Sequence, residues 1–449
     1  MRTANIKCSY IRNNAYRIEG EFFLNDNSYL SLPLEQHRER CTALGEIANV
    51  FNPGIFKRQF CVDTPHAVQY FQSSDVNSIS ERSIVFVNKR QAEKLNLLVH
   101  KGDILITGFG TIGNTRIVSS FQNETCFANN VCRVRVSEES DRGYIYAFLS
   151  SKYGSAQLNK NASGSVVRYI EAPGIRKTLV PIVSDALKFK INDLISSSII
   201  LREKSYKSLT KSHELIEDIF PNLPTQANTA IISIKDIWSS QAHRMESSYH
   251  IADGKFYDAF IRDNFLWKPL GDMSKSISRP DIFKRMYVDN GITFLGGTDI
   301  MLSIPDSKKK LSKKAPHLDD FMVDEGWILL PRSGTIGDVV YTTSQHAQKL
   351  VSEHVIRIIP NDILSGGYVF AFLSSKIGRA LIQRPIFGSV IQHVEPPLLK
   401  TMPIPIIEDE KMEEISNLAE TYRSAWGEAC KKELEAIALV EAEIEKWNK

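Results

Sequence analysis

Two copies of one pattern decide the fold of this chain: GDILITGFGTIG at residues 102–113 and GWILLPRSGTIG at residues 326–337. Their residue numbers differ by 224, and the same offset relates YIYAFLSSK at 144–152 to YVFAFLSSK at 368–376. A solenoid has shorter and more numerous units than a long period that occurs only twice. The sequence therefore predicts a tandem duplication of one whole domain.

The offset changes upstream of these patterns. IFKR at residues 55–58 matches IFKR at residues 282–285 with an offset of 227, as RIE at 17–19 matches RME at 244–246. The second copy must therefore have fewer residues between Arg285 and Asp299 than the first has at the matching place. We expect the loops in this region to differ between the two copies.

Composition is ordinary for a folded chain of 449 residues, with 43% hydrophobic and 24% charged residues and a net charge of +3. This charge neither requires nor excludes nucleic acid, so a phosphate-binding surface would come from local clusters. The six cysteines form no CxxC pair, which is typical of reduced thiols and makes a zinc site improbable. The sequence shows no transmembrane segment and no secretion signal, so we expect a cytoplasmic protein.

Each copy is predicted to be an α+β domain with a curved, mainly antiparallel sheet. Helices are expected at residues 144–158 and 368–382, where apolar residues follow a helical spacing. Short runs rich in β-forming residues predict strands at 67–71, 84–87, 103–107, 116–118 and 131–136.

A long amphipathic helix is predicted after each domain. Apolar residues recur at steps of three and four between residues 187 and 220 and again between 408 and 447. Such helices need a partner, so we expect them to pack as an antiparallel coiled-coil pair that acts as a spacer; whether their outer faces also bind partners stays open. The predicted parts are a first domain, a spacer helix, a linker, a second domain and a second spacer helix, at residues 1–184, 185–220, 221–234, 235–407 and 408–449.

The stretch at residues 108–113 satisfies GxGxxG after a predicted strand, a pattern that binds dinucleotides when a helix follows. The second copy has Arg332 in place of the first glycine, and strand-like residues follow the pattern in both copies. The nucleotide interpretation therefore fails. The shared Gly-Thr-Ile-Gly predicts a tight turn between two strands, either purely structural or also close to a phosphate.

We find no catalytic or cofactor-binding motif in the sequence: it lacks a Walker A loop, a His-x-x-x-His pair and the Asn/Asp-Pro-Pro-aromatic motif of adenine methyltransferases. His66, His317 and His354 have no matched partner in the other copy, so surface or structural roles are expected. Glu171 and Glu395 match each other but stand alone, which favours a structural cap or a hydrogen-bond acceptor over a general base.

Basic residues fall in predicted loops, partly at matched positions of the two copies. Lysine and arginine beside polar residues can position phosphates and contact base edges, although each cluster is also compatible with a solvated surface. The candidate DNA-binding residues are Lys57, Arg58, Lys89, Arg90, Ser165, Arg168, Lys284, Arg285, Lys313, Lys314, Arg332, Ser333, Ser389 and Gln392.

The order of these features resembles the specificity subunit of type I restriction-modification systems. The resemblance rests on the two motifs at 102–113 and 326–337, the Phe-Leu-Ser-Ser-Lys helices, the Gly-Ser-Val loops and the Pro-Ile exits into long helices, and it spans nearly the whole chain. Gly108 and Phe109 depart from the basic-polar pair that the family often shows there, so a DNA contact at this turn is expected in the second domain, at Arg332 and Ser333.

The resemblance implies a non-catalytic subunit whose two target-recognition domains each read half of a split, asymmetric DNA site. It also implies two adenine methyltransferase subunits as partners, which hold S-adenosylmethionine, and an endonuclease subunit joined through them. No cofactor is expected in this chain. Two alternatives remain: a standalone DNA-binding regulator or a recognition subunit of another defence assembly, and an enzyme that uses the first GxGxxG.

Overall fold

The computed structural model describes residues 8–13, 18, 23, 25–80, 83–163, 168–221, 223, 232–239, 245, 249–250, 252–386 and 392–448. The matched RIE and RME stretches lie outside these residues, except for Ile18 and Met245. None of the helices in the described part of the chain combines the length and the apolar character needed to cross a membrane.

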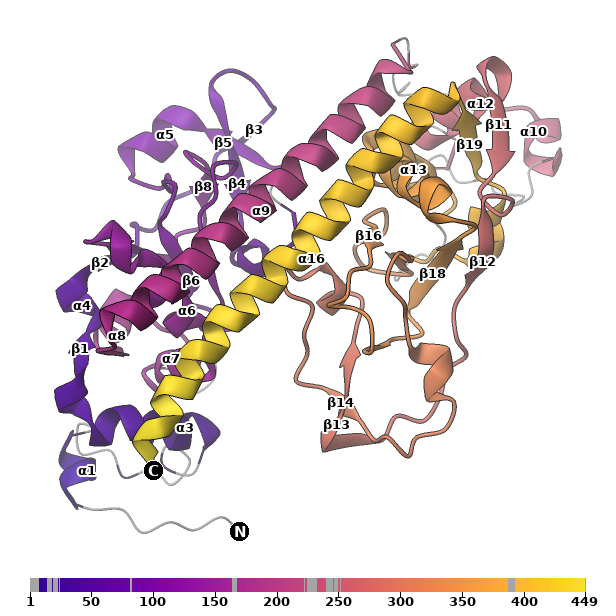
Figure 1. Cartoon of the computed structure of the whole chain (residues 1–449). Coiled ribbons are helices and arrows are strands. Elements are labelled where there is room, and N and C mark those ends of the chain that lie inside the picture. The colour runs from indigo at the N-terminus through magenta and orange to yellow at the C-terminus, as the bar shows by residue number, and fades with distance from the viewer. Residues whose placement is uncertain are drawn as a thin grey trace. The chain divides into compact units, whose positions relative to one another are not determined.

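The chain forms two compact units, which divide inside its two long helices. The first unit contains Met1–Glu203 with Ala429–Lys449, and the second contains Lys204–Glu428. The helices are α9 (Asp185–Asp218) and α16 (Asp409–Glu445). Each unit thus combines one copy of the duplicated domain with part of both helices (Figure 1), whereas the sequence-based ranges separate the helices from the domains.

One four-stranded antiparallel sheet recurs in both units, and we call it the repeat sheet. Its strand order is β2-β9-β6-β7 in the first unit and β12-β18-β15-β16 in the second. The strands are β2 (Ala48–Phe51), β6 (Ile104–Thr107), β7 (Thr115–Ile117), β9 (Val131–Val136), β12 (Ser274–Ser278), β15 (Ile328–Pro331), β16 (Val340–Tyr341) and β18 (Val355–Pro360). A two-stranded ladder also recurs, as β1 (Cys41–Ala43) with β10 (Leu179–Pro181) and β11 (Leu266–Pro269) with β19 (Pro403–Ile406).

A second sheet differs between the units, and we call it the variable sheet. Its order is β3-β5-β4-β8 in the first unit, from β3 (Phe60–Cys61), β4 (Ala67–Phe71), β5 (Phe86–Asn88) and β8 (Cys126–Phe127). The second unit has β14-β13-β17, from β13 (Tyr287–Leu295), β14 (Lys310–Leu311) and β17 (Leu350–Val351). The continuous strand β13 replaces β3, a turn and β4, which accounts for the shorter second copy. The α+β architecture with mainly antiparallel sheets is confirmed; β4 with β8 and β13 with β17 are parallel pairs.

A single helix is expected at residues 144–158 and another at 368–382, and this prediction is wrong in one respect: each stretch forms two helices. The first is α6 (Arg142–Ser150) and α7 (Lys152–Lys160), and the second is α13 (Ile363–Ser374) and α14 (Lys376–Gln383). The other helices are α1 (Cys8–Asn13), α3 (Asp26–Gln36), α4 (Leu44–Ile47), α5 (Lys89–Lys94), α8 (Ala172–Arg176), α10 (Ile234–Ser239), α12 (Asp253–Asn264) and α15 (Pro396–Lys400), with short 3-10 turns between elements.

The two helices of each pair are separated within the Phe-Leu-Ser-Ser-Lys motif. Ser151 and Ser375 have extended backbones, and their hydroxyls accept the N–H of Gly154 and Gly378 at 3.2 Å as helix N-caps. A Cβ on Gly154 would lie 2.2 Å from the Phe148 carbonyl oxygen. Only glycine therefore allows the second helix to turn so closely on the first.

A buried arginine joins the two sheets of each unit. Arg133 donates to the carbonyls of Val131, Ala128 (3.1 Å), Leu97 (3.0 Å) and Phe127 (2.8 Å). Burial lowers the pKa of its guanidinium to about 10, and backbone oxygens accept from both of its terminal nitrogens in place of water.

Arg357, 224 residues later, makes the same joint in the second unit. It donates to Ser352 at 3.0 Å, to Val355 at 2.6 Å and to the Val351 carbonyl, and burial likewise lowers its pKa to about 10. The sequence analysis missed both arginines; the signal was an arginine inside apolar β-runs at matched positions.

The two long helices run antiparallel within each unit. In the first unit, the Ser198 hydroxyl donates to the Ala429 carbonyl at 2.9 Å, and Glu433 accepts from Tyr146 at 2.6 Å and from Arg202 at 2.7 Å. Glu433 and Tyr146 are each 5% exposed, and the Arg202 side chain is 16% exposed. The anchor of α16 to the first unit is therefore a buried polar cluster.

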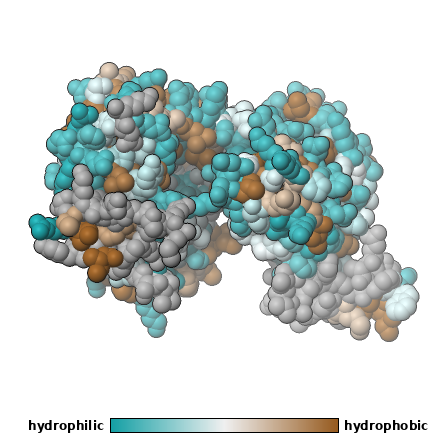
Figure 2. All heavy atoms as spheres, turned by 90° about the horizontal axis from the view of Figure 1, so that it is seen from below, coloured by the Kyte–Doolittle hydropathy of each residue, from teal (hydrophilic) through white to brown (hydrophobic). Residues whose placement is uncertain are grey.

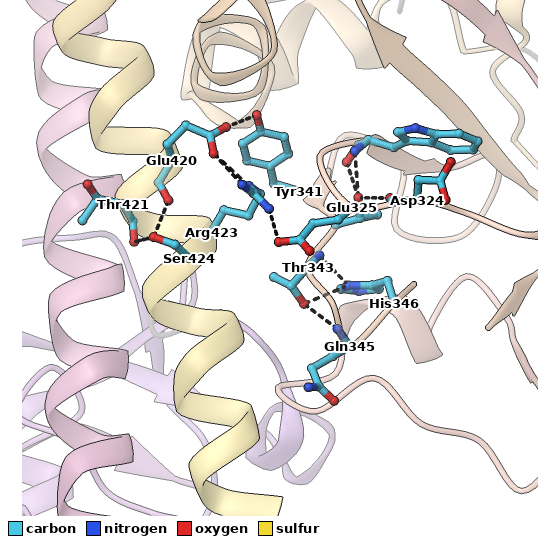
Figure 3. Close-up of polar contacts among 12 residues, drawn as sticks. Asp324, Glu325, Tyr341, Thr343, Gln345, His346, Glu420, Thr421, Arg423 and Ser424 are labelled. Carbon is cyan, nitrogen blue, oxygen red and sulfur yellow. Dashed lines mark hydrogen bonds and ion pairs between the residues drawn. The ribbon is translucent and has the colours of Figure 1, made fainter. Parts of the chain in front are cut away.

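In the second unit, the Ser205 hydroxyl donates to the Tyr422 carbonyl at 2.8 Å. Figure 3 shows that Glu420 of α16 meets both Tyr341 and Arg423, and that Arg423 also reaches Glu325. The Arg423 to Glu420 distance is 2.7 Å. This anchor is less enclosed than the one in the first unit, because the Glu325 side chain is 50% exposed.

Candidate nucleic-acid interface

Four basic candidates come together on the variable sheet of the first unit. Lys57 and Arg58 precede β3, and Lys89 and Arg90 begin α5; all four are exposed. The Gln91 side chain, next to Arg90, donates to the Lys57 carbonyl at 3.0 Å and so ties the two segments together. The Arg58 guanidinium lies 5.5 Å from the ring centre of Tyr70 (an aromatic residue of β4), which orients it.

The second unit assembles its matched basic residues in the same way. Lys284 and Arg285 precede β13, and Lys313 and Lys314 follow β14. The two segments are adjacent because the Ser312 N–H donates to the Met286 carbonyl at 2.9 Å. Lys284, Lys313 and Lys314 are exposed. Each variable sheet therefore has a cluster of cationic side chains on the segments that flank its strands.

Exposed apolar side chains lie in the same segments. Ile55 and Phe60 of the first unit are 93% and 61% exposed, and Ile282 and Tyr287 of the second are 77% and 51% exposed. On the face shown in Figure 2, hydrophobic residues form small patches within a mainly hydrophilic surface. Cations beside apolar groups can contact phosphates and the methyl groups of thymine.

Carboxylates hold three arginines of this region in the second unit. Glu395 accepts from Arg332 Nε at 2.7 Å and from Arg279 Nε at 3.2 Å. Burial alone would raise the pKa of Glu395, but the hydrogen bonds from Arg332 and Arg279 hold it below its usual value. The expectation that Glu395 is a hydrogen-bond acceptor is confirmed.

Arg285 is held by a second carboxylate, Glu353, which is 2% exposed. Burial again opposes ionisation of Glu353, yet its own backbone N–H and Arg285 lower its pKa. The Arg285 guanidinium also lies 5.2 Å from the Phe294 ring centre, and His354 lies 3.6 Å from Glu353. Sequence analysis missed Glu353, because its match in the first copy is Asn129 and no spacing marks it.

The Gly-Thr-Ile-Gly stretches are hairpin turns, as predicted. β6 pairs with β7 and β15 with β16, so a strand, not a helix, follows each turn. Gly110, Gly113, Gly334 and Gly337 have φ values of 74°, 86°, 84° and 109°, a region that favours glycine. The structure thus agrees with the rejection of the dinucleotide interpretation; approach to a phosphate stays a prediction.

Three of the remaining candidates are among the described residues. Arg168 is exposed and donates to the Asn159 carbonyl at the end of α7. Ser333 is half-buried and Gln392 is exposed. Ser165 and Ser389 lie outside the described residues.

The described ranges hold free thiols but no metal-binding group. These contain no group of three or more His, Cys, Asp or Glu residues arranged to hold a metal ion. The six cysteines are free thiols, of which Cys126, Cys132 and Cys430 are buried.

Comparisons with known proteins concern the fold. No protein-family model matches the chain, and no curated protein matches it. Among solved structures, a type I restriction-modification S subunit from M. genitalium is 11% identical, with 91% of this chain and 95% of that chain covered and a TM-score of 0.32. An HsdS subunit from Thermoanaerobacter tengcongensis is 13% identical, with 91% and 96% covered and a TM-score of 0.28.

A third structure, whose subject is complex assembly and conformational transition of the type I R-M system, is 12% identical, with 91% and 96% covered and a TM-score of 0.30. The likenesses are distant, and the functional proposal rests on the residues of this chain.

Proposed function

We propose that this chain is a non-catalytic DNA sequence-recognition subunit that binds a bipartite, asymmetric duplex target. The observation that carries the proposal is the pair of basic clusters at matched places on the two variable sheets. Two copies of one binding element on a single chain suit a target with two separate halves. The clusters differ in apolar neighbours and in carboxylate partners, which favours two different half-site sequences.

The proposal extends to the partners that the motif resemblance implies. Two adenine methyltransferase subunits, which would hold S-adenosylmethionine, would bind this chain, and an endonuclease subunit would join through them. The chain would supply sequence recognition and leave the chemistry to these partners. The long helices α9 and α16 would set the spacing between the half-sites.

The first test measures DNA binding by the full chain at several salt concentrations. Changing Lys57, Arg58, Lys89 and Arg90 together to alanine should weaken binding and reduce the dependence of log K on log salt by roughly four, about one for each lost phosphate contact. The control changes Lys204 and Lys207, exposed on α9, and should leave both quantities unchanged. Equal effects of the two variants would contradict the proposed interface.

The second test separates the proposal from a standalone regulator. Coexpression with an adenine methyltransferase from the same genome should give a stable complex, and mapping of modified adenines should give a split, asymmetric motif. Replacing residues 235–407 with the second domain of a relative should change one half of that motif only. DNA binding without copurifying methyltransferase, and with unchanged adenine methylation, would favour the regulator.

A further inference from the structure

The arginine pair on Glu395 differs from the other cationic candidates in how firmly it is placed. Arg332 donates to one carboxylate oxygen of Glu395 through Nε and, at 2.5 Å, through Nη2. Arg279 donates to the other oxygen through Nε. A guanidinium carries five N–H donors in a rigid plane. Binding of one edge to a carboxylate leaves the donors of the opposite edge for a ligand.

The surroundings of this pair connect it to the proposed interface. Arg332 follows β15 at the hairpin turn, and Arg279 begins the loop that leads to Lys284 and Arg285. The side chains of Arg332 and Arg279 are 19% and 28% exposed, so they are held without being enclosed. The three charged groups sum to one positive charge, which suits an electronegative base edge or a phosphate.

The first unit has a different arrangement at the matched positions. Gly108 replaces Arg332 and Asn52 replaces Arg279. The Asn52 side chain accepts the Ala172 N–H at 2.8 Å, and Phe109 stacks on Tyr169 with ring centres 5.4 Å apart. The carboxylate is retained as Glu171, but both guanidiniums are gone.

We propose that Glu395 positions Arg332 and Arg279 to read guanine, so that the half-site contacted by the second domain contains at least one G·C pair that the first half does not read in this way. Arginine donates two parallel hydrogen bonds to guanine O6 and N7 in the major groove, and a fixed guanidinium loses little freedom when it does so. A lysine at the same place supplies a positive charge but lacks the two parallel N–H donors of a guanidinium, which we call the fork. This inference rests on the proposed DNA recognition and deepens it.

The test selects binding sequences from a pool of random-sequence duplex DNA, using the full chain with any subunits that copurify. Glu395→Gln keeps the size of the side chain but removes its charge, and Arg332→Lys keeps the charge but removes the fork. Each should lower the preference for G·C at one position of one half-site by roughly tenfold, while the other half-site stays unchanged. The matched control is Glu171→Gln, which should leave both halves unchanged.

The outcomes are distinguishable. A motif whose G·C preference is the same in Glu395→Gln, Arg332→Lys and the unchanged protein overturns the guanine assignment and leaves the proposed function intact. Selection of no motif by the unchanged protein overturns both. A thermal melt of each variant checks folding, and if Glu395→Gln unfolds, Arg332→Lys decides the question because it retains an ion pair with Glu395.

Discussion

The repeat sheets of the two units agree in places where the variable sheets differ. Arg133 and Arg357 make equivalent bonds to backbone carbonyls, and Tyr144 and Tyr368 donate to the carbonyls of Pro181 and Pro405 at 2.6 and 2.8 Å. The variable sheets share their pairing, since β4 is parallel to β8 and antiparallel to β5 as β13 is parallel to β17 and antiparallel to β14. They differ in that β3 and β4 of the first unit are separate strands, whereas the second unit has the single continuous strand β13.

This difference separates two physical demands. A buried donor without a partner costs about 1–3 kcal/mol of stability. The interiors of both units therefore keep the same side-chain hydrogen bonds to backbone carbonyls. Surface residues on the variable sheets carry no such penalty and can differ. The part-exposed Arg279 and Arg332 of the second unit stand where the first unit has Asn52 and Gly108, and the proposed function assigns this difference to recognition.

The largest expected effect concerns the helix anchors of the two units. Glu433→Ala leaves Arg202 and Tyr146 without their shared acceptor in a buried site, and should lower the free energy of unfolding by about 3–5 kcal/mol. Glu420→Ala removes a less enclosed acceptor and should cost about 1–2 kcal/mol. Urea denaturation measures both losses, and hydrogen exchange assigns each to its unit. Equal losses would remove the distinction between a buried and a part-exposed anchor.

A second comparison pairs His346 with Gln122, its match in the first copy. Burial lowers the pKa of His346 from 6.5 to about 4, while its ring packs 5.5 Å from that of Trp426. Between these pH values the unfolded chain binds a proton that the folded chain does not, so stability should fall as pH drops from 6.5 towards 4. The loss should reach about 3 kcal/mol.

The variant His346→Gln gives the second unit the neutral residue of the first. It should lack this part of the pH dependence, whatever its stability at neutral pH. Denaturation of both proteins at several pH values measures the difference. Parallel pH profiles would show that His346 does not stay neutral when folded.

A third comparison tests the hairpin turns. A Cβ on Gly108 would lie 2.6 Å from the Ile170 carbonyl oxygen and 2.9 Å from that of Asn130, so Gly108→Ala should cost about 1–3 kcal/mol. Arg332→Ala keeps the backbone bond to His354 (2.8 Å) and loses a part-exposed ion pair, which should cost about 1 kcal/mol or less. Thermal denaturation compares them. A larger loss for Arg332→Ala would mean that its ion pair is a folding element.

The smallest effects are expected for exposed lysines of the two basic clusters. Lys89→Ala and Lys313→Ala should each weaken DNA binding by a few fold for every sequence and lower the salt slope by about one. Neither should change stability. Binding titrations with selected and unrelated duplexes measure the affinity and the salt slope. A change in sequence preference would show that the lysine contacts a base and not only a phosphate.

Much of the fold could be predicted from local sequence. The strands expected at 67–71 and 131–136 agree with β4 and β9 residue for residue, because runs of β-forming residues end at polar turns. The two long helices follow from a hydrophobic step of three and four residues. The basic candidates could be named from composition and matched positions, although their contact with DNA stays a prediction.

The sequence by itself determined the duplication, the α+β class and the long helices, since these depend on periodicity and on glycine or proline at fixed places. The tertiary structure decided the rest. Arg133 reaches the carbonyl of Leu97, 36 residues away, only after the chain has folded, and Glu395 meets Arg279 and Arg332 from more than 60 residues away. Pairings of this kind depend on which chain segments the fold brings together, and no local pattern encodes that distance.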